Sequence, residues 1–185
     1  MTNNLQLAVA IISELQHPDL TKIAADRFDK LLAKMWHDPT ALCLVAGALL
    51  DASLVDIAKR VLERSLELNP TAADTHYHLG ILYEQLGNPH AALSYYQSAV
   101  EFNPRMHFAR NNLALILTAL GRYTEALQEY DQLVDMEPVI ITNQLNRSLV
   151  LRKLDRTTEA IEILSAAHDR DPECVGVCSA LAMGY

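Results

Sequence analysis

The sequence has little cysteine, little glycine and little positive charge, and each scarcity narrows the classes of function. Its three cysteines include no CxxC pair, so they provide no disulfide framework and indicate a reducing compartment. Its six glycines form neither a GxGxxG nor a Walker nucleotide-binding motif. Lys and Arg number 15 against 23 Asp and Glu, a net charge of -8. This balance argues against a nucleic-acid partner, because such binders concentrate positive charge.

Long apolar runs are also missing, since a membrane span needs about 20 consecutive apolar residues. The N-terminal segment MTNNLQLAVAIISELQ lacks the basic region of a signal peptide, and Ser13 and Glu14 interrupt its apolar residues. We therefore expect a cytoplasmic protein without membrane insertion. The chain of 185 residues is 50% hydrophobic and 21% charged, which predicts a folded domain with a core rather than disorder.

The most informative pattern is an internal repeat with a period of 34 residues. Three columns recur at this period: alanines at Ala24, Ala58, Ala92, Ala126 and Ala160; large apolar residues at Phe28, Leu62, Tyr96, Tyr130 and Leu164; and prolines at Pro70, Pro104, Pro138 and Pro172. The period predicts one domain over residues 1–185. Its units lie near 5–38, 39–72, 73–106, 107–140 and 141–174, with the start of another unit at 175–185.

Each unit is expected to form two α-helices. Apolar residues recur at helical spacing on both sides of a short GNP segment. In this segment Gly87 ends the first helix, Asn88 caps the second and Pro89 occupies its first position. Thr71 and Asp74 have the spacing of a capping box at the start of the next helix. So short a turn predicts that the two helices run antiparallel.

Gly80 interrupts the apolar stripe of a predicted first helix, where glycine costs about 1 kcal/mol relative to alanine. The residues at the same position in other units are small as well: Ala46, Ala114, Ser148 and Ala182. Small side chains allow two helices to approach to the lower end of the usual separation of about 8–10 Å. We therefore expect this column to contact the alanine column.

The pattern Leu79, Gly80, Tyr83, Gly87, Ala92, Tyr96, Ala99 and Pro104 resembles the tetratricopeptide repeat family. The resemblance is strongest for the units that begin at Ala73 and His107, and weakest for the first unit, where Trp36 replaces the closing proline. It implies an all-α fold, a right-handed superhelical solenoid of antiparallel helix pairs with about eleven helices. It also implies that the inner face, built mainly from the first helix of each unit, binds peptides or proteins.

The residues of the inner face are expected to be those on the first helices that do not belong to the packing columns. On the helix that begins at His107 they are spaced i, i+3, i+4 and i+7, so they form one stripe, and adjacent units continue it. The predicted peptide-binding residues are Tyr77, His78, Ile81, Phe108, Asn111, Asn112, Leu115, Leu145, Asn146 and Leu149. Exposed apolar residues in such a stripe indicate an interaction site. Alternatively, some of them pack between adjacent first helices.

Two functions of different class remain. The first is a scaffold or adaptor without enzymatic activity that binds a protein or peptide segment in the groove. The second follows from Asn112 and Asn146, one unit apart, which resemble the asparagine ladder of repeat arrays attached to O-linked glycosyltransferases. The chain would then be the N-terminal, substrate-presenting part of a larger enzyme, inactive alone. A co-chaperone role is disfavoured, because the columns where the family's peptide clamp has Lys and Asn hold Cys43, Gly47, Tyr77 and Ile81.

Metal, cofactor and catalytic sites are not expected. His76 and His78 lie two residues apart on a helix and therefore face different directions. Cys174 and Cys178 are four residues apart, but only His168 is nearby as a third ligand, whereas zinc takes three or four. We interpret these cysteines as thiols without a ligand.

The last segment, residues 175–185, carries no charge and repeats the packing columns of a first helix through Leu181, Ala182 and Tyr185. A second helix is expected to cover such a surface, because each unit of a repeat array covers its neighbour. Either the natural chain continues, or a second copy supplies the cover. The sequence thus predicts self-association through residues 175–185.

Overall fold

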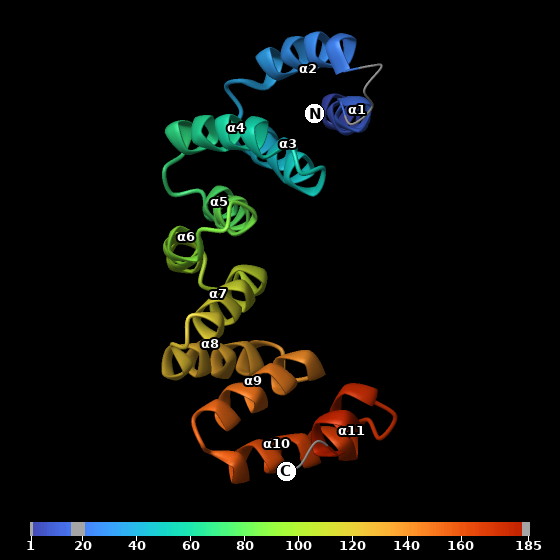
Figure 1. The fold of residues 1–185 in the computed structure, drawn as a ribbon. Helices are drawn as coiled ribbons and strands as arrows, with labels where there is room; N and C mark the ends of the chain where they lie inside the picture. Colours follow the sequence, from blue (N-terminus) through green and yellow to red (C-terminus); the bar gives the residue numbers. More distant parts are fainter. Residues whose placement is uncertain (1, 16–20, 183–185) are drawn as a thin grey trace. The chain divides into compact units, whose positions relative to one another are not determined.

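The computed structural model describes residues 2–15 and 21–182, and in these ranges it contains eleven α-helices and no β-strand. The chain forms two compact units, Met1–Asn103 and Pro104–Tyr185, which we describe separately as unit 1 and unit 2. Figure 1 shows the helices in chain order. Among the described residues, no helix is both long and apolar enough to cross a lipid bilayer.

Unit 1 consists of three helix pairs. Its helices are α1 (Thr2–Leu15), α2 (Thr21–Met35), α3 (Pro39–Asp51), α4 (Val55–Leu68), α5 (Ala73–Gln85) and α6 (Pro89–Phe102). The two members of each pair pack on each other, and the first helices of consecutive pairs, α1 with α3 and α3 with α5, also contact each other. The predicted pairing by repeat unit is confirmed here.

Unit 2 consists of two helix pairs and one further first helix. Its helices are α7 (His107–Ala119), α8 (Tyr123–Met136), α9 (Ile141–Lys153), α10 (Thr157–Arg170) and α11 (Val175–Ala182). Helix α7 packs on α8, α9 packs on α10, and α11 packs on both α9 and α10. The expected all-α fold with about eleven helices is therefore confirmed for the described residues.

The turn between the two helices of a pair has the same backbone in four repeats. Its central residue has a positive φ angle: 59° at Ser53, 68° at Gly87, 75° at Gly121 and 59° at Asp155. These residues are 34 positions apart, and each turn repeats the hydrogen bonds seen around Gly87. There the amide of Gly87 donates to the carbonyl of Glu84 at 2.9 Å, and that of Asn88 to Tyr83 at 2.8 Å. This is the Schellman arrangement that ends an α-helix.

The starts of the helices agree with the sequence in one case and differ in another. The side chain of Asn88 accepts a hydrogen bond from the amide of Ala91 at 3.1 Å, which confirms its capping role. The capping box predicted for Thr71 and Asp74 is wrong, because α5 begins after Ala72 without a side-chain cap. The hydroxyl of Thr71 instead donates to the side chain of Asn69 at 3.2 Å and stabilises the loop.

The core follows the predicted columns. All five alanines of the alanine column are fully buried, and so are the large residues one turn further along the second helices. The structure adds a contact that was not predicted for Gly80. The three atoms nearest to the position that a Cβ would take on Gly80 belong to the ring of Tyr96, in the large apolar column. A missing side chain on the first helix therefore makes room for an aromatic ring on the second.

A further column of the repeat, which was not predicted from the sequence, forms hydrogen bonds to the loops that contain Pro70, Pro104, Pro138 and Pro172. The residue six positions after each proline donates a hydrogen bond to the proline carbonyl oxygen. The pairs are His76 with Pro70 at 2.8 Å, Arg110 with Pro104 at 3.0 Å, Gln144 with Pro138 at 3.0 Å and Cys178 with Pro172 at 3.3 Å. These bonds satisfy loop carbonyl groups that lie outside the helices and therefore have no intrahelical partner.

Candidate functional site

The ten predicted peptide-binding residues lie on the first helices, and the division of the chain separates them. Tyr77, His78 and Ile81 belong to α5 of unit 1. The other seven belong to unit 2, on α7 and α9. Each unit thus presents its own part of the predicted face.

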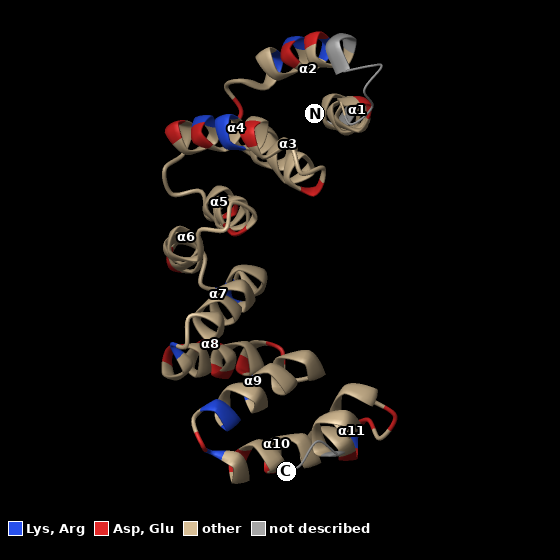
Figure 2. Ribbon diagram, viewed as in Figure 1, with Lys and Arg blue, Asp and Glu red and all other residues tan. Residues whose placement is uncertain are grey.

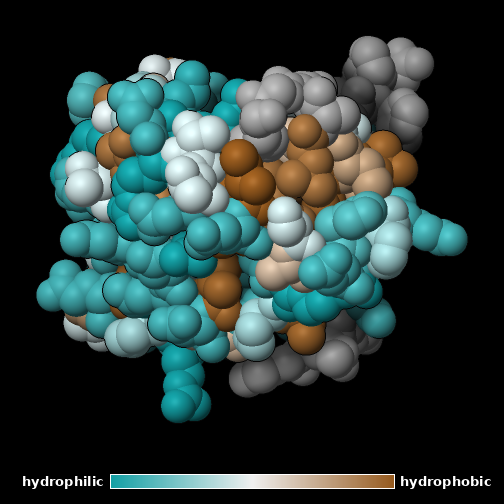
Figure 3. Space-filling view, turned by 90° about the horizontal axis from the view of Figure 1, so that it is seen from below, coloured by the Kyte–Doolittle hydropathy of each residue, from teal (hydrophilic) through white to brown (hydrophobic). Residues whose placement is uncertain are grey.

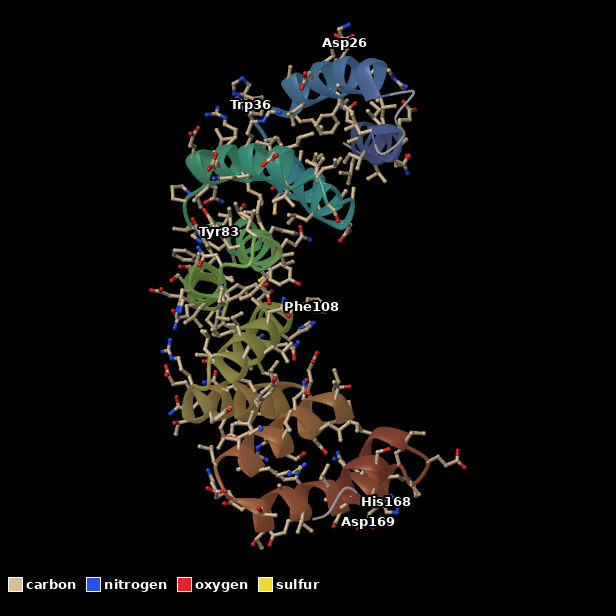
Figure 4. The ribbon with its side chains drawn as sticks, viewed as in Figure 1. Asp26, Trp36, Tyr83, Phe108, His168 and Asp169 are labelled. Carbon is tan, nitrogen blue, oxygen red and sulfur yellow. The ribbon has the colours of Figure 1, made fainter. Side chains whose placement is uncertain are left out.

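The exposed apolar residues of the predicted face are all in unit 2. Phe108 is 61% exposed, and Leu115 and Leu149 are each 45% exposed. Figure 4 shows Phe108 near the beginning of α7. The ring of the adjacent His107 lies at a centroid distance of 4.0 Å from that of Phe108. On the same two helices, four further residues of the predicted face are half-buried: Asn111, Asn112, Leu145 and Asn146. Both helices therefore carry exposed apolar residues together with half-buried amides.

Two apolar residues of the predicted face, Ile81 and Leu145, are half-buried rather than exposed, because they pack on neighbouring helices. Ile81 packs against the hydrophobic core of unit 1. In unit 2 the Cδ1 atom of Leu145 lies 3.0 Å from the position that a Cβ would take on Gly176 of α11. For these residues, packing between first helices accounts for much of the apolar surface.

In unit 1, His78 lies across the preceding first helix, α3. Its Nδ1 atom is 2.8 Å from the carbonyl oxygen of Asp74 and 3.3 Å from Sγ of Cys43. A Cβ on Gly47 would lie 2.8 Å from Nε2 of His78, so this glycine makes room for the ring. Burial raises the pKa of the Cys43 thiol to about 11, and the charge of Asp74 adds to the effect, against an opposing hydrogen bond with Thr75. Cys43 is therefore a neutral thiol at physiological pH.

The first helices of the two units carry opposite charges. On α1, α3 and α5 the charged residues are all acidic: Glu14, Asp51, Asp74 and Glu84. On α7, α9 and α11, within the bounds given above, they are all basic: Arg110, Arg147, Arg152 and Lys153. Figure 2 shows acidic residues on α3 and α5 and basic residues at the end of α9. The formal charge of the first helices is therefore negative in unit 1 and positive in unit 2.

Two of these basic residues are held within the fold. Arg110 is 4% exposed and forms an ion pair with Glu129 of α8. The Nε atom of Arg147 lies 2.6 Å from the carboxylate of Asp131, also on α8. Arg152 and Lys153, in the last turn of α9, are exposed. The exposed positive charge on the first helices of unit 2 therefore concentrates at this end of α9.

Side chains with metal-ligand chemistry do not converge within the part of the chain that the structure describes. There is no group of three or more His, Cys, Asp or Glu side chains there that could hold an ion. Cys178 has its Sγ atom 3.8 Å from Nδ1 of His168 and donates a hydrogen bond to the carbonyl of Pro172. The structure thus gives the Cys178 thiol a role in holding a loop.

Residues 175–182 of the segment predicted to self-associate form α11. Within this helix Val177 is fully buried and Val175 is 76% exposed. Figure 3, seen from below relative to Figure 1, shows hydrophobic residues gathered in a patch on an otherwise mostly hydrophilic surface. Tyr185, which the sequence places in a packing column, lies outside the described residues. Self-association through residues 175–185 stays a prediction.

Comparison with protein families identifies the repeat. A model of the tetratricopeptide repeat matches residues 73–106, and a second model of this repeat matches residues 112–174. The chain belongs to the tetratricopeptide repeat family. The matched residues lie in the third, fourth and fifth units of the 34-residue period.

Solved structures of other tetratricopeptide repeat proteins show the same fold. A crystal structure of MamA protein has a TM-score of 0.72 at 19% sequence identity and covers 94% of this chain and 94% of that chain. YrrB, described as a TPR protein with an unusual peptide-binding site, has a TM-score of 0.72 at 23% identity. That match covers 95% of this chain and 90% of YrrB. A search of curated proteins found no match.

Proposed function

We propose that this tetratricopeptide repeat protein is a scaffold that binds an extended segment of another protein on the first helices of its repeats. The observation that carries the proposal is the exposure of Phe108, Leu115 and Leu149 on the first helices of unit 2. Apolar side chains that remain in water on an otherwise well-packed helix are a source of binding free energy, at about 25 cal/mol per Å² of apolar surface buried. The peptide-binding site named for YrrB supports the proposal by analogy.

The half-buried asparagines supply the polar part of this interaction. The amide side chains of Asn111 and Asn146 lie on the same helices as the exposed apolar residues and have both donor and acceptor groups. An extended peptide has unpaired backbone groups of both kinds, so these amides hold its main chain while the apolar residues contact its side chains. We expect a dissociation constant in the micromolar range, which corresponds to about -8 kcal/mol.

The alternative function, presentation of substrates to a glycosyltransferase domain, depends on the column of Asn112 and Asn146. Both side chains are half-buried on consecutive first helices of unit 2. The described residues provide no further observation that favours this alternative over general segment binding. A non-enzymatic role in the cytoplasm remains our expectation.

Selection from a library of random dodecapeptides, displayed on phage, tests the proposed binding. Selected peptides are labelled with fluorescein, and their affinity is measured for the wild type and for the double variant Phe108→Ala and Leu149→Ala. We expect the double variant to bind at least about tenfold more weakly, because it loses two exposed apolar contacts, equivalent to about 1.4 kcal/mol or more.

A matched control removes exposed apolar side chains elsewhere in unit 2. Val139 is 81% exposed and Val175 is 76% exposed, and neither belongs to the predicted face. The variant Val139→Ala with Val175→Ala should bind the peptides as the wild type does. Circular dichroism melts confirm that each variant is folded. If the double variant Phe108→Ala and Leu149→Ala is folded and binds the peptides with the wild-type affinity, this face is not the binding site.

A further inference from the structure

Two hollows lie one repeat apart on unit 1. The first has a volume of about 480 Å³ and is lined by Asn4, Leu5, Lys34, Met35, Asp38, Thr40, Ala41 and Leu44. The second has a volume of about 310 Å³ and is lined by Pro39, Thr40, Cys43, Leu44, Asn69, Ala72, Asp74, Thr75 and His78. Each lies between the beginnings of two consecutive first helices and the loop that joins two repeats.

The two hollows are equivalent by the period of the sequence. Six residues of the first, at positions 5, 35, 38, 40, 41 and 44, correspond after 34 residues to positions 39, 69, 72, 74, 75 and 78 of the second. Thr40 and Leu44 line both hollows and therefore form the wall between them. A repeated cavity of this kind offers two places for side chains of one segment.

The first hollow is mainly apolar. Leu5, Met35 and Leu44 contribute its largest apolar side chains, and Leu44 is 51% exposed. The carboxylate of Asp38 accepts hydrogen bonds from the amides of Thr40 and Ala41, at 3.0 and 3.1 Å, and so serves as the cap of α3. Lys34 also lines this hollow, which makes it unfavourable for a cation. An apolar side chain of a partner fits it best.

The second hollow is acidic. Asp74 contributes an exposed carboxylate, Asn69 contributes an amide, and no Lys or Arg is among the lining residues. The charged residues of the three first helices of unit 1 are all acidic, so no cation on these helices competes for Asp74. A Lys or Arg side chain from a partner would gain charge-assisted hydrogen bonds there.

The separation of the hollows sets the spacing of the partner's side chains. Helices α1, α3 and α5 pack in sequence, and packed helices are about 8–10 Å apart. An extended chain advances about 3.3–3.6 Å per residue. Two side chains that enter consecutive hollows therefore come from residues about two or three positions apart.

We propose that unit 1 binds an extended segment in which an apolar residue and a Lys or Arg lie two or three positions apart. The apolar side chain occupies the first hollow, and the cation pairs with Asp74 in the second. This inference rests on the proposed binding of extended segments by first helices, and it adds the chemical class of the segment.

The dodecapeptide library, displayed on phage, tests the specificity. On wild-type protein we expect selected peptides to be enriched in Lys or Arg two or three positions from an apolar residue. On the variant Asp74→Lys the preference for Lys or Arg should disappear, and Asp or Glu should take their place. Asp51→Lys is the matched control, since Asp51 is exposed on α3 but lines neither hollow, and it should select the same peptides as the wild type.

Affinities of selected peptides, measured by fluorescence anisotropy, separate this inference from the proposed function. Asp74→Asn should weaken the binding of a basic peptide at least about fivefold and leave the melting curve unchanged. If selected peptides show no basic preference but depend on Phe108 and Leu149, unit 1 lacks the inferred specificity while the proposed function stands. If they depend on Asp74 and not on Phe108, the inference stands and the face of unit 2 does not. A library that yields no binding peptide overturns both.

Discussion

The ring of Tyr96 lies directly against the backbone of Gly80, so closely that a Cβ on Gly80 would overlap the Cε1 and Cδ1 atoms of the ring. The Tyr96 hydroxyl donates a hydrogen bond to the carboxylate of Glu84, one turn further along α5. The ring is fully buried, and the glycine opens the space that it occupies. The helix-propensity cost of glycine at this position, about 1 kcal/mol, is therefore offset by the burial of a large aromatic side chain.

Replacement of Gly80 by alanine should destabilise unit 1. The new methyl group would overlap the ring of Tyr96, and overpacking of a core costs about 1–3 kcal/mol. Urea unfolding followed by circular dichroism measures the change. In a Tyr96→Leu background the same replacement should cost much less, because the smaller side chain can give way.

Gly176→Ala provides the contrast for this experiment. The atom nearest to the position that its methyl group would take is the flexible end of Leu145, at 3.0 Å, and this side chain can move. We expect no loss of stability there, because alanine is the better helix former. A loss at Gly80 that persists in the Tyr96→Leu background would show that the ring is not the cause.

The positive φ angles in the turns of unit 2 predict that introducing a glycine and removing one have opposite effects on stability. Asp155 has a φ of 59° and occupies the position that Gly121 occupies one repeat earlier, with a φ of 75°. Asp155→Gly should stabilise the protein by about 0.5 kcal/mol, and Gly121→Ala should destabilise it by about 1 kcal/mol, because a Cβ is strained in this conformation. Urea midpoints measure both changes.

An exposed position in the middle of a helix serves as the control for Asp155→Gly. Ser165 is exposed on α10, where Ser165→Gly should lower stability by several tenths of a kcal/mol, up to about 1, through helix propensity alone. If Asp155→Gly lowers stability as Ser165→Gly does, the turn places no demand on its central residue.

The raised pKa of Cys43 predicts that the folded protein loses stability at alkaline pH. Its pKa is raised from 9.0 to about 11 in the folded protein, chiefly by burial. The unfolded chain releases this proton from about pH 9, whereas the folded protein retains it to about pH 11. The contribution of the protonated Cys43 thiol to the free energy of unfolding is thus fully present below pH 9 and is lost as pH rises to 11. Over this range the free energy of unfolding falls by up to about 1.4 kcal/mol per pH unit.

Urea unfolding between pH 8 and pH 11, a range that ends at the raised pKa, measures this effect in the wild type and in Cys43→Ala. The variant should lose less stability across the range, although its stability at pH 8 is lower because a buried side chain is shortened. Cys174→Ala should keep the wild-type profile, since Cys43 remains. Parallel profiles for the wild type and Cys43→Ala would contradict the raised pKa.

Much of the fold could be read from the sequence because its signals are local. The period of 34 residues placed the helix pairs, and the residues of the GNP segment ended one helix and began the next at positions that the structure confirms. The column of His76, Arg110, Gln144 and Cys178 was also legible as a row of polar residues at the same period. Its role became apparent only once the proline carbonyls were located.

By itself the sequence determined the helices, the repeat and the buried alanine column, because periodicity and turn residues act within one unit. The tertiary structure decided which first-helix residues are exposed, since neighbouring helices half-bury Ile81 and Leu145 but leave Phe108 in water. It also decided that Tyr96 covers Gly80, and that Leu44 and Asp74 border a common hollow. Such contacts depend on how closely helices of different repeats or faces approach, and this distance is set by side-chain sizes across the whole interface rather than by any one segment.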